Sequence, residues 1–216
     1  MINNEFFLGY LNGSIQTLIG HPLDTLKVLK QKNKKIKKYN LNNLFKGLSA
    51  PLLLNSSIIS IQFGLNNYFY YYTNNYFTSG FIAGSISSIF VNPIEVYKVR
   101  LQTNKKFLKK HTFKGLNLCF FRESIGNLFY FGIYNYLSNK KINPFLAGGL
   151  SGWISWLFTY NLDVIKTRIQ TKNNLTILQA INQGNLWKGF GICSVRSFLV
   201  NGSGFYFYNL IKNYNL

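Results

Sequence analysis

The sequence predicts an all-α membrane protein whose six transmembrane helices form three pseudo-threefold repeats of a helical hairpin around a central cavity. Three observations indicate this fold class: an internal repeat, long runs without charge, and basic residues confined to alternate links between those runs. A repeat of about seventy residues in a chain of 216 allows three units and leaves no room for a fourth.

The repeat is clearest in three stretches that begin at residues 22, 93 and 161: PLDTLKVLKQ, PIEVYKVRLQ and NLDVIKTRIQ. Each stretch places a base three residues after an acid and a glutamine seven residues after that acid. Residues three apart share one face of a helix, so each acid and its base point to the same side. The pairs are Asp24/Lys27, Glu95/Lys98 and Asp163/Lys166.

Six helices are expected, in order over residues 5–30, 48–73, 78–102, 116–138, 145–170 and 190–212. The first covers the charge-free run 6–20. The second and third share the uncharged stretch 48–94, which is long enough for two crossings of about 20 residues each and is divided by the polar sequence YTNNYFTSG. The last three cover the uncharged runs 124–139, 142–162 and 197–211. Paired in order, the helices give expected repeats at residues 1–75, 76–142 and 143–216, within one transmembrane domain.

The balance of 24 basic and 5 acidic residues gives a formal charge of +19, which first suggests a nucleic acid or an anionic membrane as partner. Most bases gather between residues 27 and 46, 98 and 114, and 166 and 188, at alternate links between the helices. That asymmetry is typical of membrane topology and puts both termini on the face opposite the basic links. A protein that binds nucleic acid needs bases along an exposed face, so no nucleic-acid partner is expected.

No residue pattern indicates an enzyme. The sequence has no metal-ligand spacing, nucleophile elbow or phosphate loop, and His21 and His111 are isolated, so neither a metal nor a cofactor is expected. Cys119 and Cys193 are too few for a disulfide framework and are expected to be small buried residues. The start resembles neither a cleavable signal peptide nor an Arg-rich transit peptide, so targeting information is expected to be internal. A passive structural membrane protein is an alternative that a test of solute exchange would exclude.

Two further features recur in register with the repeat. Glycines four residues apart precede each acid–base stretch and allow neighbouring helices to approach closely; they are Gly9 and Gly13, Gly80 and Gly84, and Gly148 and Gly152. An aromatic residue, a lysine and a glycine follow each stretch, at 45–47, 113–115 and 187–189. Over nearly the whole chain these motifs resemble the mitochondrial carrier family, whose signature is Pro-x-Asp/Glu-x-x-Lys/Arg-x-Lys/Arg and then aromatic-Lys/Arg-Gly. Asn161 in place of the third proline, Leu29 in place of a base, and short links depart from that pattern.

The resemblance implies a membrane solute transporter that works by alternating-access exchange. Its matrix-side gate would be a ring of ion pairs, Asp24–Lys98, Glu95–Lys166 and Asp163–Lys27. Gln31, Gln102 and Gln170 would lie one helical turn beneath this ring and brace it. Three of the 5 acids occupy ring positions, and charges inside a membrane are costly, which favours a gate over static pins that hold the bundle together.

The ring on the opposite side is expected to be weak. The family often places an acid and a base at each of its positions, but here the acid positions hold Asn67, Asn135 and Asn209, and the base positions hold Tyr70, Ser138 and Lys212. We expect hydrogen bonds and aromatic packing in place of ion pairs on this side. The resting equilibrium should therefore favour a cavity open to the cytoplasm.

The family's substrate contact points correspond to Leu54 and Asn55, Arg122 and Glu123, and Arg196 with its neighbour. Two arginines favour a small anionic metabolite, unless Arg122 merely neutralises Glu123. The Arg-Glu pair resembles carriers of amino acids and carnitine, in which Glu123 would meet an ammonium group. Aromatic rings around the expected cavity can instead stack on a nucleobase or simply pack between helices; they are Tyr130, Phe131, Tyr134, Trp153, Trp156 and Tyr206.

The heavy use of Asn, Lys, Ile and Tyr in a short chain also resembles compact carriers encoded by giant DNA viruses of amoebae. That resemblance implies nucleotide or deoxynucleotide exchange, because a DNA virus needs precursors. A nucleotide or deoxynucleotide is therefore expected as substrate ahead of an amino acid or carnitine.

The aromatic-Lys-Gly motifs begin the even helices, where free amide groups and nearby lysines are suited to an anionic lipid headgroup. The residues are Lys46, Gly47, Lys114, Gly115, Lys188 and Gly189. The family precedent for the lipid is cardiolipin, and an ordinary tight helix start is the alternative. The resemblance further implies a multi-pass monomer in the inner mitochondrial membrane, in a host mitochondrion if the chain is viral.

Overall fold

The computed structural model of the chain describes residues 2–31, 45, 48–102, 112–171 and 175–214. These residues form six long helices and one short helix, with no strand among them. The long helices are α1 (Ile2–Gln31), α3 (Ser49–Thr73), α4 (Tyr76–Gln102), α5 (Leu116–Asn139), α6 (Pro144–Thr171) and α8 (Phe190–Tyr214). Each lies within a few residues of its expected range, which confirms the all-helical fold class.

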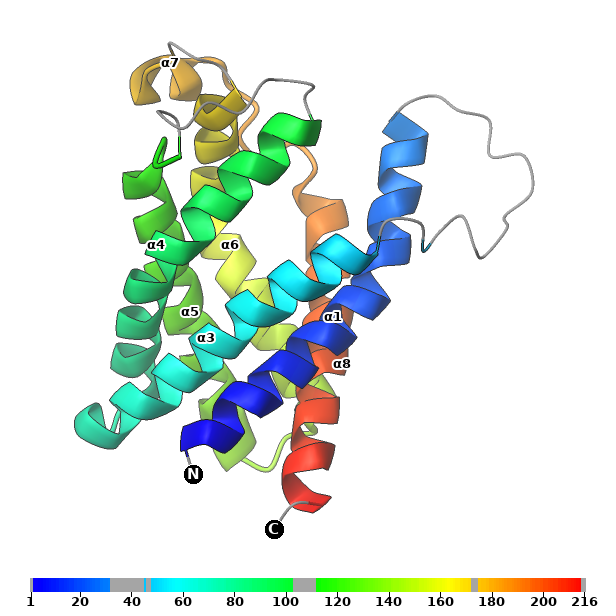
Figure 1. Ribbon diagram of the computed structural model, residues 1–216, viewed down its shortest axis with the longest axis vertical. Coiled ribbons are helices and arrows are strands. Elements are labelled where there is room, and N and C mark those ends of the chain that lie inside the picture. The colour runs from blue at the N-terminus through cyan, green and yellow to red at the C-terminus, as the bar shows by residue number, and fades with distance from the viewer. Residues whose placement is uncertain (1, 32–44, 46–47, 103–111, 172–174, 215–216) are drawn as a thin grey trace.

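The six long helices form a bundle whose two ends differ (Figure 1). Both chain termini lie at one end, together with the short turns from α3 to α4 and from α5 to α6. The short helix α7 (Ile177–Asn182) and the carboxyl ends of α1, α4 and α6 lie at the other end. We call these ends the termini side and the link side. The termini therefore lie opposite the ends from which the basic links leave, as the charge pattern predicted.

The closest helix pairs are α1 with α3, α4 with α5, and α6 with α8. The paired glycines explain this, since a side chain at any of the six would collide with the partner helix. A Cβ atom at Gly13 would lie 2.7 Å from Ser56 Cα, and one at Gly148 would lie 2.7 Å from Phe205 Cβ. The close approach of the backbones confirms the small-residue faces, while the boundaries of the three repeats remain a prediction.

Polar side chains fill much of the interior, and many large apolar side chains face outward. The buried polar residues include Asn12, Ser56, Asn92, Lys166 and Gln170. The exposed apolar and aromatic residues include Phe7, Tyr71, Phe121, Ile192 and Val195. Such an arrangement suits a bundle in lipid, where charged and polar groups turn toward the inside. By length and hydropathy, Tyr76–Tyr97 of α4 is the one segment of the described chain that qualifies by itself as a span.

The short helix α7 was not among the predicted elements. Thr176 Oγ1 accepts from the Gln179 amide nitrogen at 3.3 Å, and Gln179 Oε1 accepts from the Thr176 amide nitrogen at 3.1 Å, so a capping box begins the helix. Arg168 of α6 donates to the carbonyl oxygens of Ala180 at 2.7 Å and Gly184 at 2.8 Å. The Thr-x-x-Gln sequence at 176–179 is the signal that would have predicted this element.

Candidate functional site

Five charged side chains meet between α4, α5 and α6, and we call them the inner charged cluster: Glu95, Arg122, Glu123, Asp163 and Lys166. Arg122 Nη2 donates to Glu95 Oε1 at 2.8 Å and also to Glu123, while Arg122 Nε lies 3.6 Å from Asp163 Oδ1. Lys166 Nζ donates to Glu95 and lies 3.6 Å from Asp163 Oδ1. Three carboxylates against two cations give the cluster a formal charge of −1.

The two cations of this cluster are largely buried, so their ion pairs affect the stability of the protein. The side chain of Lys166 is 2% exposed and that of Arg122 is 13% exposed. Removing an ion from water costs several kcal/mol, and mutual attraction offsets this cost only when the geometry is good. A charge in this cluster that loses its partners should therefore be strongly destabilising.

Glu123 has two further partners outside the cluster. Gln62 Nε2 of α3 donates to Glu123 Oε2 at 3.0 Å, and Asn127 Nδ2 lies 3.3 Å from the same oxygen. With Arg122 on the other carboxylate oxygen, donors from two helices fix the orientation of Glu123. Because its orientation is fixed, Glu123 can accept a hydrogen bond from a ligand group that replaces one of these donors.

The structure describes one of the three ring bonds expected at the matrix gate. Glu95 and Lys166 are paired, across α4 and α6. The other two bonds depend on Asp24, Lys27 and Lys98, whose side chains the structure does not describe. The gating role of the ring remains a prediction.

Arg122 occupies a position that the sequence did not anticipate. The sequence predicts that Arg122 contacts the substrate, with simple neutralisation of Glu123 as the alternative. The guanidinium bonds Glu123 at the expected contact point. It also bonds Glu95 and approaches Asp163, which are acids of the expected ring. Arg122 thus connects the expected substrate contact point with the expected gate.

Gln170, expected to brace the ring, is fully buried and bonds elsewhere. Its Nε2 donates to Asn92 Oδ1 at 3.2 Å and lies 3.5 Å from the Lys114 carbonyl oxygen. These contacts join α6 to α4 and to the segment before α5, and not to a charge of the ring. The structure describes the backbone of Gln31 and Gln102 but not their side chains.

The remaining expected contact points lie on α3 and α8. A Cβ atom at Gly20 would lie 3.2 Å from Arg196 Nη2, so Arg196 of α8 lies against α1. Within the described part of the chain, Leu54 and Asn55 give the cluster no hydrogen bond or ion pair, and Leu54 is 38% exposed. Helix α3 contributes Gln62 instead, about two helical turns further along.

The two described aromatic-Lys-Gly motifs share a backbone conformation. Gly115 has φ 77° and Gly189 has φ 92°, in the left-handed region that glycine adopts without strain. Each glycine ends its link in a tight turn just before α5 or α8 begins. Lys46 and Gly47 lie outside the described residues. An anionic lipid at these motifs remains a prediction, as does the monomeric state.

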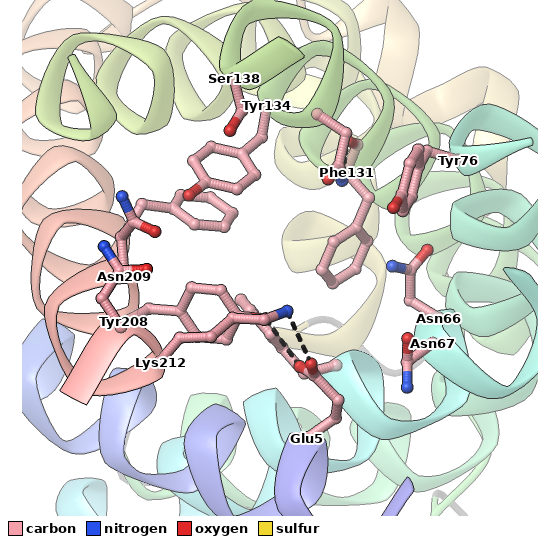
Figure 2. Close-up of a pocket in the computed structure, with 14 residues that line it drawn as sticks. Glu5, Asn66, Asn67, Tyr76, Phe131, Tyr134, Ser138, Tyr208, Asn209 and Lys212 are labelled. Atoms are coloured by element: carbon pink, nitrogen blue, oxygen red, sulfur yellow. Dashed lines mark hydrogen bonds and ion pairs between the residues drawn. The ribbon is translucent and has the colours of Figure 1, made fainter. Parts of the chain in front are cut away.

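A second polar site lies on the termini side, and we call it the termini-side pocket (Figure 2). Its cavity measures about 240 Å³. Lys212 Nζ of α8 pairs with Glu5 Oε1 of α1 at 2.9 Å, and the Tyr208 hydroxyl donates to Glu5 Oε2 at 2.7 Å. The other polar lining residues include five asparagines from three helices: Asn66 and Asn67 of α3, Asn135 of α5, and Asn209 and Asn213 of α8.

The expectation for this side of the molecule needs one correction. Asparagines occupy the three acid positions and aromatic rings pack here, as expected, but an ion pair is also present. Its acid is Glu5 of α1, whereas the prediction considered acids on even helices only. Lys212 therefore has a partner that the comparison of even helices could not reveal.

Aromatic rings separate the termini-side pocket from the interior of the bundle. Tyr134 and Phe205 stack with ring centroids 3.5 Å apart, and Phe63 meets Phe131 edge-on at 5.0 Å. All four rings are part of one buried cluster supplied by α3, α5 and α8. Phe131 and Tyr134 were among the rings expected around the cavity, whereas Phe63 and Phe205 were not.

The sequence is similar to proteins of one family. The family model "Mitochondrial carrier protein" matches residues 70–113 and 138–216, more than half of the chain. The mitochondrial arginine transporter BAC2 of Arabidopsis thaliana is 26% identical, in an alignment that covers 95% of this chain and 89% of the relative. The mitochondrial glycine transporter YMC1 of Saccharomyces cerevisiae is 27% identical, over 93% of this chain and 88% of the relative. The human mitochondrial basic amino acids transporter is 28% identical, over 97% and 90%. These relatives give no support to the viral resemblance drawn from composition.

Proposed function

The chain belongs to the mitochondrial carrier family, and from that premise we propose that it exchanges amino acids across the membrane, with a preference for those that carry a cationic side chain. Members of the family are transporters and not enzymes, and this chain is a multi-pass protein of the inner mitochondrial membrane. The observation that carries the proposal is the buried Arg122–Glu123 pair, in a cluster whose described carboxylates outnumber its described cations.

Each charged group of an amino acid has a counterpart in the inner charged cluster. The planar guanidinium of Arg122 is suited to the α-carboxylate. Glu123, oriented by Gln62 and Asn127, is suited to the α-ammonium group. Among the side chains that the structure describes, the cluster has one more carboxylate than cations, which favours a substrate with a second positive charge.

The contacts of Arg122 suggest how binding opens the gate. In the structure Arg122 bonds Glu95 and lies near Asp163, and both are acids of the expected ring. A substrate carboxylate that binds the Arg122 guanidinium would draw it away from Glu95 and Asp163, which would weaken the ring. Only a ligand that interacts differently with the closed and open states shifts the equilibrium, and competition for Arg122 supplies such a difference.

The same charge count disfavours the nucleotide expected from composition. A nucleotide brings several negative charges, and three carboxylates in a buried cluster would repel them. The three relatives described above are named for arginine, glycine and basic amino acids, and none for a nucleotide. The amino-acid alternative raised by the Arg-Glu pair is therefore the function that we propose.

Reconstituted liposomes test this proposal. Vesicles loaded with arginine should take up labelled arginine or lysine by exchange, vesicles without internal substrate should take up little, and ADP should not exchange. Glu123→Gln should lower the rate roughly 10- to 100-fold, because a hydrogen bond between charged groups contributes about 1.5–3 kcal/mol. Tyr71→Phe, on a ring that is 78% exposed, is the matched control and should leave the rate unchanged.

Two results would overturn the proposal. One is exchange of ADP or a deoxynucleotide by vesicles that fail to exchange any amino acid. The other is a Glu123→Gln variant that exchanges arginine as fast as the unaltered chain.

A further inference from the structure

We propose that the termini-side pocket is a second, outer binding site for the head group of an α-amino acid, with the ammonium group on Glu5 and the carboxylate on Lys212. The identity of this ligand rests on the proposed function, whereas the site itself rests on the geometry of the pocket. The ligand would bind here before it reaches the inner charged cluster.

The pocket has one charge of each sign, and both lie on one wall. Among its lining residues the only acid is Glu5 and the only base is Lys212, in the described part of the chain. The corresponding place in the second repeat holds no charge, since Tyr76 stacks there on Tyr70 with centroids 3.8 Å apart. A pocket with no net charge and one close pair of opposite charges favours a zwitterion over a polyanion.

The pair is accessible from the side of Lys212. The Lys212 side chain is 44% exposed and that of Glu5 is 12% exposed. A ligand carboxylate can therefore replace Glu5 at Lys212, while the buried Glu5 gains a new cationic partner in the ligand's ammonium group. The inner charged cluster differs in this respect, because its lysine is 2% exposed.

The Tyr208 hydroxyl provides a hydrogen-bond partner for both charged groups while they exchange partners. Its hydroxyl donates to Glu5 at 2.7 Å and lies 3.2 Å from Lys212 Nζ, so it contacts both. When a ligand separates the pair, each group retains its contact with Tyr208 and gains one ligand group. The ammonium and carboxylate of an α-amino acid are attached to one carbon, and they therefore match two protein groups that begin 2.9 Å apart.

The remaining wall is suited to the rest of the ligand. Figure 2 shows Asn66 and Asn67 across the cavity from Tyr208 and Lys212. Side-chain amides offer donors and acceptors without a net charge, so they can contact polar side chains of several kinds. The outer site should therefore select the head group strictly and the side chain loosely.

The outer site is separate from the inner charged cluster. Glu123 and Phe131, the first α5 residue of the pocket, are eight residues apart, which is about 12 Å along the helix. Along α3, α5 and α8 the pocket residues nearest the inner charged cluster are Phe63, Phe131 and Phe205, and the ring of Phe63 packs against the other two. A ligand in the pocket must displace these rings to reach Glu123.

Protection of a single cysteine at the rim of the pocket tests the proposal. Asn213→Cys, made together with Cys193→Ser, provides a thiol at the pocket, while Cys119 is buried and stays in place. The rate of maleimide labelling should fall by a factor of 1 + [L]/Kd, about tenfold when L-arginine is present at ten times its Kd. Glycine should also protect, and ADP should not. Adding Lys212→Gln or Glu5→Gln should abolish the protection, and thermal unfolding midpoints would show that these variants are folded.

The same experiment in a Glu123→Gln background separates the two proposals. Protection by arginine that persists there supports an outer site. Protection that disappears with Glu123→Gln would show that arginine acts only at the inner site, which would overturn the outer site and support the proposed function. Protection that survives both Lys212→Gln and Glu5→Gln, or no protection in any background, would also overturn the outer site. Failure of the unaltered chain to exchange any amino acid would overturn both.

Discussion

The inner charged cluster and the termini-side pocket each join a carboxylate to a lysine, but they differ in burial and in the number of charges. Lys166 is 2% exposed and shares two carboxylates with Arg122, whereas Lys212 is 44% exposed and pairs with Glu5 alone. A buried network is costly to unbalance, and an accessible pair is easily exchanged. The difference teaches that similar ion pairs in one bundle can serve different purposes, one to hold a binding site and a gate together and the other to admit a ligand.

Removing each lysine in turn provides the strongest contrast. Lys166→Met removes one of the two described cations that face one buried and two half-buried carboxylates, so we expect a loss of about 3–5 kcal/mol in stability. Lys212→Met should cost less, because Lys212 is 44% exposed and Glu5 keeps the Tyr208 hydroxyl. Thermal unfolding of the purified proteins in detergent measures both. Equal losses would contradict the distinction between the two regions.

A substitution that preserves charge sharpens the role of Arg122. Lysine in its place keeps the positive charge but loses the planar fork that serves Glu95 and Glu123 at once. Arg122→Lys should lower arginine exchange roughly 10- to 100-fold, since a hydrogen bond between charged groups contributes about 1.5–3 kcal/mol. Exchange in reconstituted liposomes measures the change, with the conservative Tyr71→Phe variant as control. An unchanged rate would show that charge alone suffices at this position.

Gly84 tests whether the inner charged cluster depends on close packing of α4 against α5. A Cβ atom there would collide with the carbonyl group of Glu123, so Gly84→Ala must displace the helix that carries Arg122 and Glu123. We expect a loss of about 1–3 kcal/mol in stability, together with slower exchange. Gly191→Ala is the matched control, because nothing lies within 4 Å of its added Cβ, and it should be neutral. Similar unfolding midpoints for the two variants would contradict this account.

The smallest effect is expected at Tyr208. Tyr208→Phe keeps the ring in the aromatic cluster and removes only the hydroxyl that contacts Glu5 and Lys212. We expect a loss of about 1 kcal/mol in stability and a rise of less than tenfold in the KM for arginine. Initial exchange rates at graded arginine concentrations measure the KM. A larger loss than that of Lys166→Met would reverse the order of importance of the two regions.

Much of the fold could be predicted from the sequence because its signals are local or repeated. Charge-free runs mark the long helices, and glycines such as Gly13 and Gly148 mark where helices touch. The acid and base at Glu95 and Lys166 recur in register, so their contact could be expected from the repeat and the family resemblance. Helix α7 was missed because its only signal is a short capping box.

The site was predicted less completely, because its contacts cross between helices at positions with no counterpart in the other repeats. Gln62 reaches Glu123 from α3, about two turns beyond the expected contact point at Leu54. Glu5 lies on α1, an odd helix, so a comparison of positions on even helices does not reveal its pair with Lys212. The rarity of acids offered the one usable signal: Glu5 is among only 5 in the chain, and an acid in a membrane helix usually has a function.

The most direct test of the central claim, that the inner charged cluster binds an amino acid with a cationic side chain, is the thermal unfolding midpoint of the purified protein with and without ligand. A ligand that binds only the folded state raises this midpoint. We expect L-arginine to raise it for the unaltered chain, to raise it much less for Glu123→Gln, and ADP to leave both unchanged. A midpoint raised by ADP and not by arginine would contradict the account.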